Sequence, residues 1–442
     1  MKLKITTLLF LISYVLQAQE NANLSLNQAI EFALQNNINV KNSTLDESIA
    51  KQKVNELTGL GTPQISGSAE INKFLEVPTT FVPAEFFDGE KGTFAPFKFG
   101  QPYTSSVGVS ASQLLFDGSY IVGLQASRAY EELSRKQTKQ TKIETAVQVS
   151  KAYYNVLVNQ ARFELVNANV DRLKKLRNDI KATYETGFAE KLDFDRMDLT
   201  YNIVLVQQQN IQKLVDLSYI LLKFQLGMDL KSNITLTDKL DEAKWSEVSM
   251  PDAADPAKRI EFSVLQTARR LDELDMKRYK SAYLPSLVAF GSYSYNASRT
   301  DFTIFDPAYR WYPTAVIGAK LNVPIWDGLQ KNSRVQQAKM ALQKIDYSLE
   351  NLQQAISLEY SSAKINQQNS LAELEINKKN REIAKEIVRA AKIKYDNGIG
   401  ASQEVVDAET SLKEAETNYY NSLYQTIVSK IDLDKSLGNL NY

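Results

Sequence analysis

Long stretches of the chain carry apolar residues at the spacing of a helix that packs along other helices. One run advances by three or four residues without a miss: Val335, Ala338, Leu342, Ile345, Leu349, Leu352 and Ile356. This spacing is a coiled-coil seam, because it keeps one narrow apolar face turned towards a partner. The last part of the chain repeats the spacing from Val405 to Tyr419, and the first half does so around residues 154–168 and 194–204. The pattern predicts four long helices, over about 119–184, 192–226, 329–397 and 403–437.

The predicted helices are unusually long. Residues 119–184 contain no proline and a single early glycine, Gly123. At about 1.5 Å per residue such a helix could reach about 99 Å. An ordinary enzyme has little use for paired helices so far above the usual length of about 11 to 12 residues. Helices of this length suit a tube or a spacer.

Four other segments alternate between apolar and polar positions with a period of two. They cover about 64–76, 104–116, 286–297 and 314–326, and in the third Phe290 falls on the polar side. The clearest is the fourth, where Ile317, Ala319 and Leu321 alternate with Gly318 and Lys320. Segments of about ten residues with one apolar face fit membrane-spanning barrel strands. They fit a sheet half-buried on a soluble core equally well.

The N-terminus favours the membrane interpretation. Lys2 and Lys4 precede an apolar run, and cleavage after Ala18 would complete a secretory signal over residues 1–18. Aromatic residues stand at or near the predicted strand ends, as in an interfacial belt: Phe116, Tyr293, Tyr295, Trp311, Tyr312 and Trp326. Four strands are too few to close a barrel, for which about eight is the usual minimum. The sequence therefore predicts an oligomer.

Two loops join the paired strands. Residues 77–103 hold four prolines and several phenylalanines, which predicts a structured cap on the extracellular side. Residues 298–312 form a shorter partner. A mobile surface loop is the alternative for both.

The sequence contains an internal repeat: short motifs of the first half recur in the second half at a spacing of about 211 residues. Phe116-Asp117-Gly118 recurs as Trp326-Asp327-Gly328, and Tyr184-Glu185-Thr186-Gly187 as Tyr395-Asp396-Asn397-Gly398. Leu226-Gly227 likewise recurs as Leu437-Gly438. The order predicts two copies of one unit, residues 19–227 and 263–442, separated by a segment over 228–262.

Composition removes most enzyme classes. The chain has no Cys and no His, so it cannot build a Ser/His/Asp or Cys/His nucleophile system or the usual zinc site. An enzyme that uses two carboxylates is disfavoured, because the acids cluster at helix starts and on helix surfaces. The 52 basic and 52 acidic residues cancel, which argues against nucleic acid as a partner. We expect no catalytic residues, no metal and no cofactor.

The sequence resembles the TolC-like outer-membrane efflux protein family. The shared pattern is a helix, two strands and long helices, which occurs twice, with a Tyr-x-x-Gly break before the second long helix of each half. The resemblance implies a mostly α-helical homotrimer whose twelve strands form one barrel in the outer membrane, continued by a helical tunnel into the periplasm. It implies an exit duct of a tripartite efflux or type I secretion system, with a periplasmic adaptor and an inner-membrane pump as partners. Residues 228–262, with Pro251 and Pro256, would be the equatorial segment. The alternative is a secreted coiled-coil scaffold or adhesin without a pore.

The resemblance also implies roles for residues at the turns between helices. Gly187 and Gly398 stop one helix and turn the chain, which glycine does without a Cβ clash. With Phe188 and Ile399 they would receive the adaptor's hairpin tips. Carboxylates just beyond the second turn, and a tyrosine before it, would form the periplasmic gate: Tyr395, Glu404 and Asp407.

The same carboxylates have a simpler interpretation. An acidic side chain in the first turn of a helix interacts favourably with the helix N-terminus, by about 0.3 to 1 kcal/mol. We expect this to account for Asp193 and Asp195 in full. For Glu404 and Asp407 the gate role is favoured, because threefold symmetry would bring three copies together, raise their pKa values and favour cations.

Overall fold

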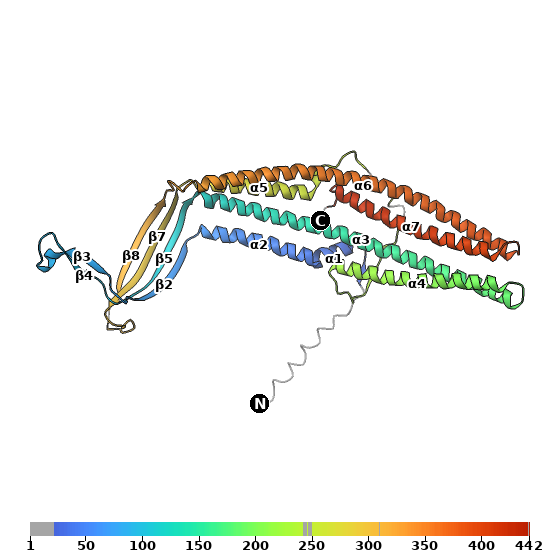
Figure 1. Cartoon of the computed structure of the whole chain (residues 1–442), viewed down its shortest axis with the longest axis horizontal. Coiled ribbons are helices and arrows are strands. Elements are labelled where there is room, and N and C mark those ends of the chain that lie inside the picture. Colours follow the sequence, from blue (N-terminus) through green and yellow to red (C-terminus); the bar gives the residue numbers. More distant parts are fainter. Residues whose placement is uncertain (1–21, 242–244, 246–249, 309, 441) are drawn as a thin grey trace, which may run out of the picture. The chain divides into compact units, whose positions relative to one another are not determined.

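The computed structural model describes residues 22–241, 245, 250–308, 310–440 and 442. The expected signal segment, residues 1–18, lies outside them. Two compact units share the chain: one holds the segments around 22–47, 133–266 and 347–442, and the other holds 48–132 and 267–346. Helices, strands and two 3-10 turns follow in this order: β1 Ala22–Leu24, α1 Leu26–Asn36, α2 Ile38–Leu60, β2 Gln64–Lys73, β3 Thr79–Pro83, η1 Ala84–Phe87, β4 Phe94–Lys98, β5 Tyr103–Asp117, α3 Gly118–Glu185, α4 Lys191–Leu226, β6 Ile234–Leu236, η3 Pro256–Lys258, α5 Ile260–Ser281, β7 Ser286–Arg299, β8 Tyr312–Asn322, α6 Gln330–Asp396 and α7 Ser402–Ser436 (Figure 1).

The second unit is built on a four-stranded antiparallel sheet in the order β2-β5-β7-β8. Its register sorts the side chains as their alternation predicts. Ser66 lies opposite Ser110, and Ser110 opposite Ser292, on the small polar face. Ala69 pairs with Val107, and Val107 with Tyr295, on the other face. Among the strands that the structure describes, the two outer ones, β2 and β8, each pair on one side only.

The structure explains how the large ring of Phe290 fits on the polar face of the sheet. It pairs with Gly318 of β8, and a Cβ added to that glycine would lie 2.8 Å from the ring. The aromatic ring therefore occupies the space that the missing side chain leaves.

Two strands end earlier than the pattern predicts. β2 ends at Lys73 and not near residue 76, and β8 shows the larger difference. β8 ends at Asn322, whereas the alternation of apolar residues continues to Ile325. Pro324 has no N–H to donate to a neighbouring strand, so the ladder stops although the side-chain period does not.

The loop over 77–103 contains a second, small hairpin of β3 and β4. Phe81 pairs with Pro96, and the rings of Phe87 and Phe97 stack at 5.5 Å. The sequence predicts order here but not strands, because four prolines interrupt any period of two.

The first unit contains the ends of the long helices, arranged as the hairpins α3–α4 and α6–α7 (Figure 1). All four helices contribute to one apolar cluster, which includes Leu173, Met197, Val388 and Leu412. A second cluster surrounds the fully buried Tyr153, whose hydroxyl donates to the carbonyl of Leu24 at 3.0 Å. None of the described helices is both long and apolar enough to cross a membrane.

Candidate functional site

The turns between paired helices share one hydrogen-bonding pattern. After α3, the N–H of Phe188 donates to Thr183 O at 2.9 Å and that of Gly187 to Tyr184 O at 3.0 Å. After α6, Ile399 donates to Lys394 O at 3.1 Å and Gly398 to Tyr395 O at 2.9 Å. This pair of backbone hydrogen bonds is the Schellman motif, which requires a residue with left-handed backbone angles. Gly187 and Gly398 supply it with φ values of 81° and 72°.

The residue after each glycine is apolar and fully presented to solvent. Phe188 is 86% exposed and Ile399 is 80% exposed. The structure places both at equivalent positions of the two turns. An exposed ring and an exposed branched chain at helix-hairpin tips are available for contact with another protein.

Below the turns, the two hairpins are joined by a hydrogen bond between their second helices. The hydroxyl of Ser402, the first residue of α7, donates to the carboxylate of Asp193 in the first turn of α4. Ser402 is buried. Asp193 therefore does more than cap the helix dipole, and our interpretation of it from the sequence was incomplete.

Tyr395 lies on the last turn of α6, half-buried against the apolar cluster shared by the four helices. Burial raises the pKa of its phenol, and the nearby carboxylates of Asp193 and Asp396 raise it further. The phenol therefore stays neutral at physiological pH.

Glu404 and Asp407 lie one turn apart on α7, and both are exposed. Glu404 forms an ion pair with Lys394 of α6, with 3.5 Å between Nζ and Oε2. Asp407 accepts a hydrogen bond of 2.7 Å from Gln403. The two predicted gate carboxylates thus have different partners within the chain.

Sequence reasoning missed a row of buried polar contacts further along the hairpins. Arg172 of α3 pairs with the buried Glu409 of α7 at 2.6 Å, and Asn169 donates to Glu416 at 2.9 Å. Burial raises the pKa of Glu416, although the bond from Asn169 opposes the shift. The signal was present: each glutamate follows a small seam residue, Ala408 or Ala415, and the two stand seven residues apart.

No group of three or more acidic side chains in the described ranges is arranged to hold a metal ion.

The fold is that of known outer-membrane channels. The VceC outer membrane protein of Vibrio cholerae matches it with a TM-score of 0.70 at 15% identity, over 93% of this chain and 96% of that one. The CmeC outer membrane channel of Campylobacter jejuni gives a TM-score of 0.74 at 16% identity, over 94% and 86%. In sequence, the outer membrane protein TolC of Vibrio cholerae is 25% identical over 340 residues, which are 76% of this chain and 77% of the relative.

The four-stranded sheet and the long helices thus have the fold of outer-membrane channels. The model of the outer membrane efflux protein family matches residues 29–227 and 264–439, and the chain belongs to that family. The predicted resemblance and fold class are confirmed. The protein is an efflux channel of the outer membrane that extends into the periplasm, and the family is one of ducts, so the pore-free scaffold is disfavoured.

Proposed function

We propose that the chain is one of three identical protomers of the exit duct in a tripartite efflux or type I secretion system. The observation that carries the proposal is the open sheet, whose outer strands β2 and β8 have one neighbour each. Unpaired strand edges are not tolerated in lipid, so a membrane sheet must close. Three copies would supply twelve strands, with the apolar faces towards lipid and the serine rows towards the lumen.

Exposed apolar stripes on the long helices support assembly with further copies. On α6, Ile376, Ile383 and Ile387 stand seven and four residues apart and are exposed. On α4, Leu214, Leu217 and Leu221 repeat the spacing of three and four. In the described part of the chain these stripes stay exposed, and exposed apolar stripes with coiled-coil spacing are surfaces for a neighbouring helix.

The two-repeat organisation belongs to the same proposal. In it, residues 19–227 and 263–442 are equivalent units, and 228–262 is the equatorial segment between them. The matched glycine turns after α4 and α7, at Gly227 and Gly438, support this division.

The helix-hairpin tips are the proposed contact for a periplasmic adaptor, which would link the duct to an inner-membrane pump. Gly187 and Gly398 shape the turns, and Phe188 and Ile399 provide the exposed apolar contact. Two equivalent tips per protomer would give a trimer six docking positions.

The periplasmic gate is proposed at Tyr395, Glu404 and Asp407. Because Lys394 partly neutralises Glu404, we assign most of the negative charge at the mouth to Asp407. The bond between Ser402 and Asp193 supports a closed arrangement, since it ties α7 to α4 where the gate would move.

Two experiments test the function. Membrane-extracted protein should migrate as a heat-resistant trimer and produce a conductance step in a planar lipid bilayer. Replacing Glu404 and Asp407 together by Ala should lessen cation block and cation preference in single-channel recordings. A monomeric product without conductance contradicts the duct, whereas an unchanged conductance profile of the double variant contradicts only the gate.

A further inference from the structure

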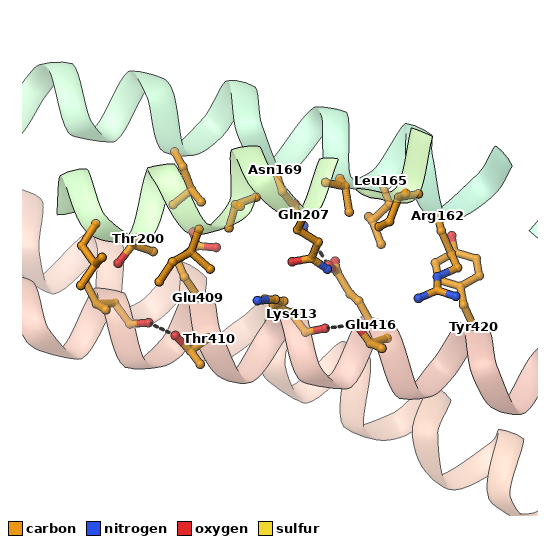
Figure 2. Close-up of a pocket in the computed structure, with 18 residues that line it drawn as sticks. Arg162, Leu165, Asn169, Thr200, Gln207, Glu409, Thr410, Lys413, Glu416 and Tyr420 are labelled. Carbon is orange, nitrogen blue, oxygen red and sulfur yellow. Dashed lines mark hydrogen bonds between the residues drawn. The ribbon is translucent and has the colours of Figure 1, made fainter. Parts of the chain in front are cut away.

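A pocket of about 290 Å3 lies between α3, α4 and α7 of the first unit, and it opens to the surface at Leu199 and Ile203. About half of the residues that line it are apolar, including Val204 and Leu165, of which Figure 2 labels Leu165. Polar side chains enter it at defined places: Arg162 lies at one end with Tyr420, and Gln207 and Lys413 lie near its middle (Figure 2). An apolar pocket with a few convergent polar groups is typical of a small-molecule site.

The two carboxylates of the lining already have partners. Glu409 pairs with Arg172, and Glu416 accepts from Asn169. The amide of Asn169 carries no charge, but burial raises the pKa of Glu416 and so favours its neutral form. Neither carboxyl group therefore leaves a full negative charge for the positive groups of the lining.

The positive groups are not balanced in the same way. Among the residues that the structure describes, no carboxylate lies within ion-pair distance of Arg162, and burial lowers the pKa of its guanidinium. Lys413 also lacks an ion pair within the described chain, although Glu409 and Glu416 flank it on its own helix. A partly buried charge without a countercharge is costly, and a bound anion would remove that cost.

The amide oxygen of Gln207 gives a second, independent observation. It is buried and accepts no hydrogen bond in the described structure. Buried acceptors are nearly always satisfied, so an empty acceptor on a cavity wall indicates a missing donor.

We propose that this cavity binds a small amphipathic organic anion, whose acid group pairs with Arg162 and whose apolar body lies between Leu165 and Val204. Gln207 would accept from a hydroxyl of the ligand. At about 30 Å3 for each water-sized group, the cavity holds roughly ten non-hydrogen atoms. A straight eight-carbon carboxylic acid has that size. The proposal does not depend on the duct function, because it concerns packing within one protomer.

The test uses the full-length protein in lipid nanodiscs and an eight-carbon carboxylic acid that carries a diazirine in its chain. Photolabelling followed by peptide mapping should mark the segments 162–173, 199–211 and 406–420. Octanoate should compete with the label, whereas octyltrimethylammonium, with the same chain and the opposite charge, should not.

Variants separate a binding role from a structural one. Arg162→Met should reduce labelling at a fixed probe concentration by about tenfold or more, since a charged hydrogen bond is lost. Arg162→Lys should keep most of the binding. Arg389→Met removes an exposed arginine of α6 and should change nothing. Without ligand, Arg162→Met should melt no lower than the parent, because an uncompensated charge has been removed.

Three results would overturn the proposal. They are labelling outside the three segments, competition by the ammonium compound as strong as by octanoate, and full labelling of Arg162→Met. A preference for 3-hydroxyoctanoate over octanoate that disappears in Gln207→Leu would support the role of the amide oxygen, and its persistence would contradict that role.

Discussion

Four glycines end the long helices with the same motif, yet the turns at the hairpin tips differ from those at the opposite helix ends. The φ values of Gly187 and Gly398 at the tips are 81° and 72°, and those of Gly227 and Gly438 are 72° and 71°. A Cβ added at either tip glycine would meet nothing within 4 Å. At Gly227 it would lie 2.5 Å from the carbonyl oxygen of Asn36, and at Gly438 2.8 Å from that of Lys258.

The difference shows that one local motif serves two purposes. At the tips glycine is needed only for its backbone angle, so the turn stays exposed and its neighbours are free to contact a partner. At the other ends the missing side chain also lets a second backbone segment pack directly against the helix end. The second pair should therefore contribute more to stability than the first pair, whose proposed role is to present the adaptor contact.

The largest expected effect is that of Gly227→Ala. The left-handed angle alone costs an alanine about 1 to 2 kcal/mol, and here a backbone carbonyl also occupies the space of the new Cβ. We expect a loss of about 4 kcal/mol or more in unfolding free energy, because a packed backbone cannot yield cheaply. Thermal unfolding and the yield of heat-resistant oligomer measure it.

Gly187→Ala is the matched control. It meets the same angle without the clash, so its loss should stay near about 1 to 2 kcal/mol. Equal losses at the two positions would show that the close packing at Asn36 contributes nothing, and the contrast between the turns would then be only one of exposure.

A double variant at the tips, Phe188→Asp with Ile399→Asp, should affect export strongly and stability little. Both side chains are exposed, so unfolding free energy should change by less than about 0.5 kcal/mol. Export of a pump substrate from cells should fall at least about tenfold, because two charges enter a proposed apolar contact.

A conservative pair, Phe188→Leu with Ile399→Leu, should retain most export. If the aspartate pair exports normally while the trimer is intact, the tips are not the adaptor contact.

The link between the hairpins should give a smaller effect, on both stability and conductance. Asp193→Asn with Ser402→Ala removes a partly buried, charge-assisted hydrogen bond, which is worth about 1.5 to 3 kcal/mol. If the link holds the mouth closed, single-channel conductance should rise. Asp195→Asn changes an exposed carboxylate in the same turn and should leave conductance unchanged. A double variant with parental conductance would reduce the link to a structural contact.

The regular parts of this fold can be read from the sequence because their periods are long and uninterrupted. The first long helix is predicted at 119–184, and α3 spans Gly118–Glu185. The sheet register follows from the alternation of side chains for the same reason. β8 departs from its pattern only where Pro324 removes a donor.

Partners of single polar groups could not be read in this way. Asp193 and Ser402 are 209 residues apart, and each alone looks like an ordinary residue of a helix start. Glu409 and Glu416 stand beside the seam, but only the packing of α3 against α7 shows that Arg172 and Asn169 meet them. The tip residues were found from the repeat and the family resemblance, whereas their roles stay predictions.

The smallest expected effect lies between the two kinds of turn, at Glu416. Burial raises the pKa of this carboxyl in the folded protein above its unfolded value. The ionised form is then disfavoured by folding, so the parent protein loses stability as pH rises through the interval between the unfolded and folded pKa values. Glu416→Gln keeps an oxygen that can accept from Asn169 and cannot ionise. Its melting temperature should therefore match the parent's at acid pH and exceed it slightly at neutral pH.

Glu414→Gln, at an exposed position of α7, should follow the parent throughout. A Glu416→Gln variant that is less stable at neutral pH would mean that the charge itself, facing Arg172, holds α7 to α3, and the contacts between the turns would then be electrostatic clamps in their own right.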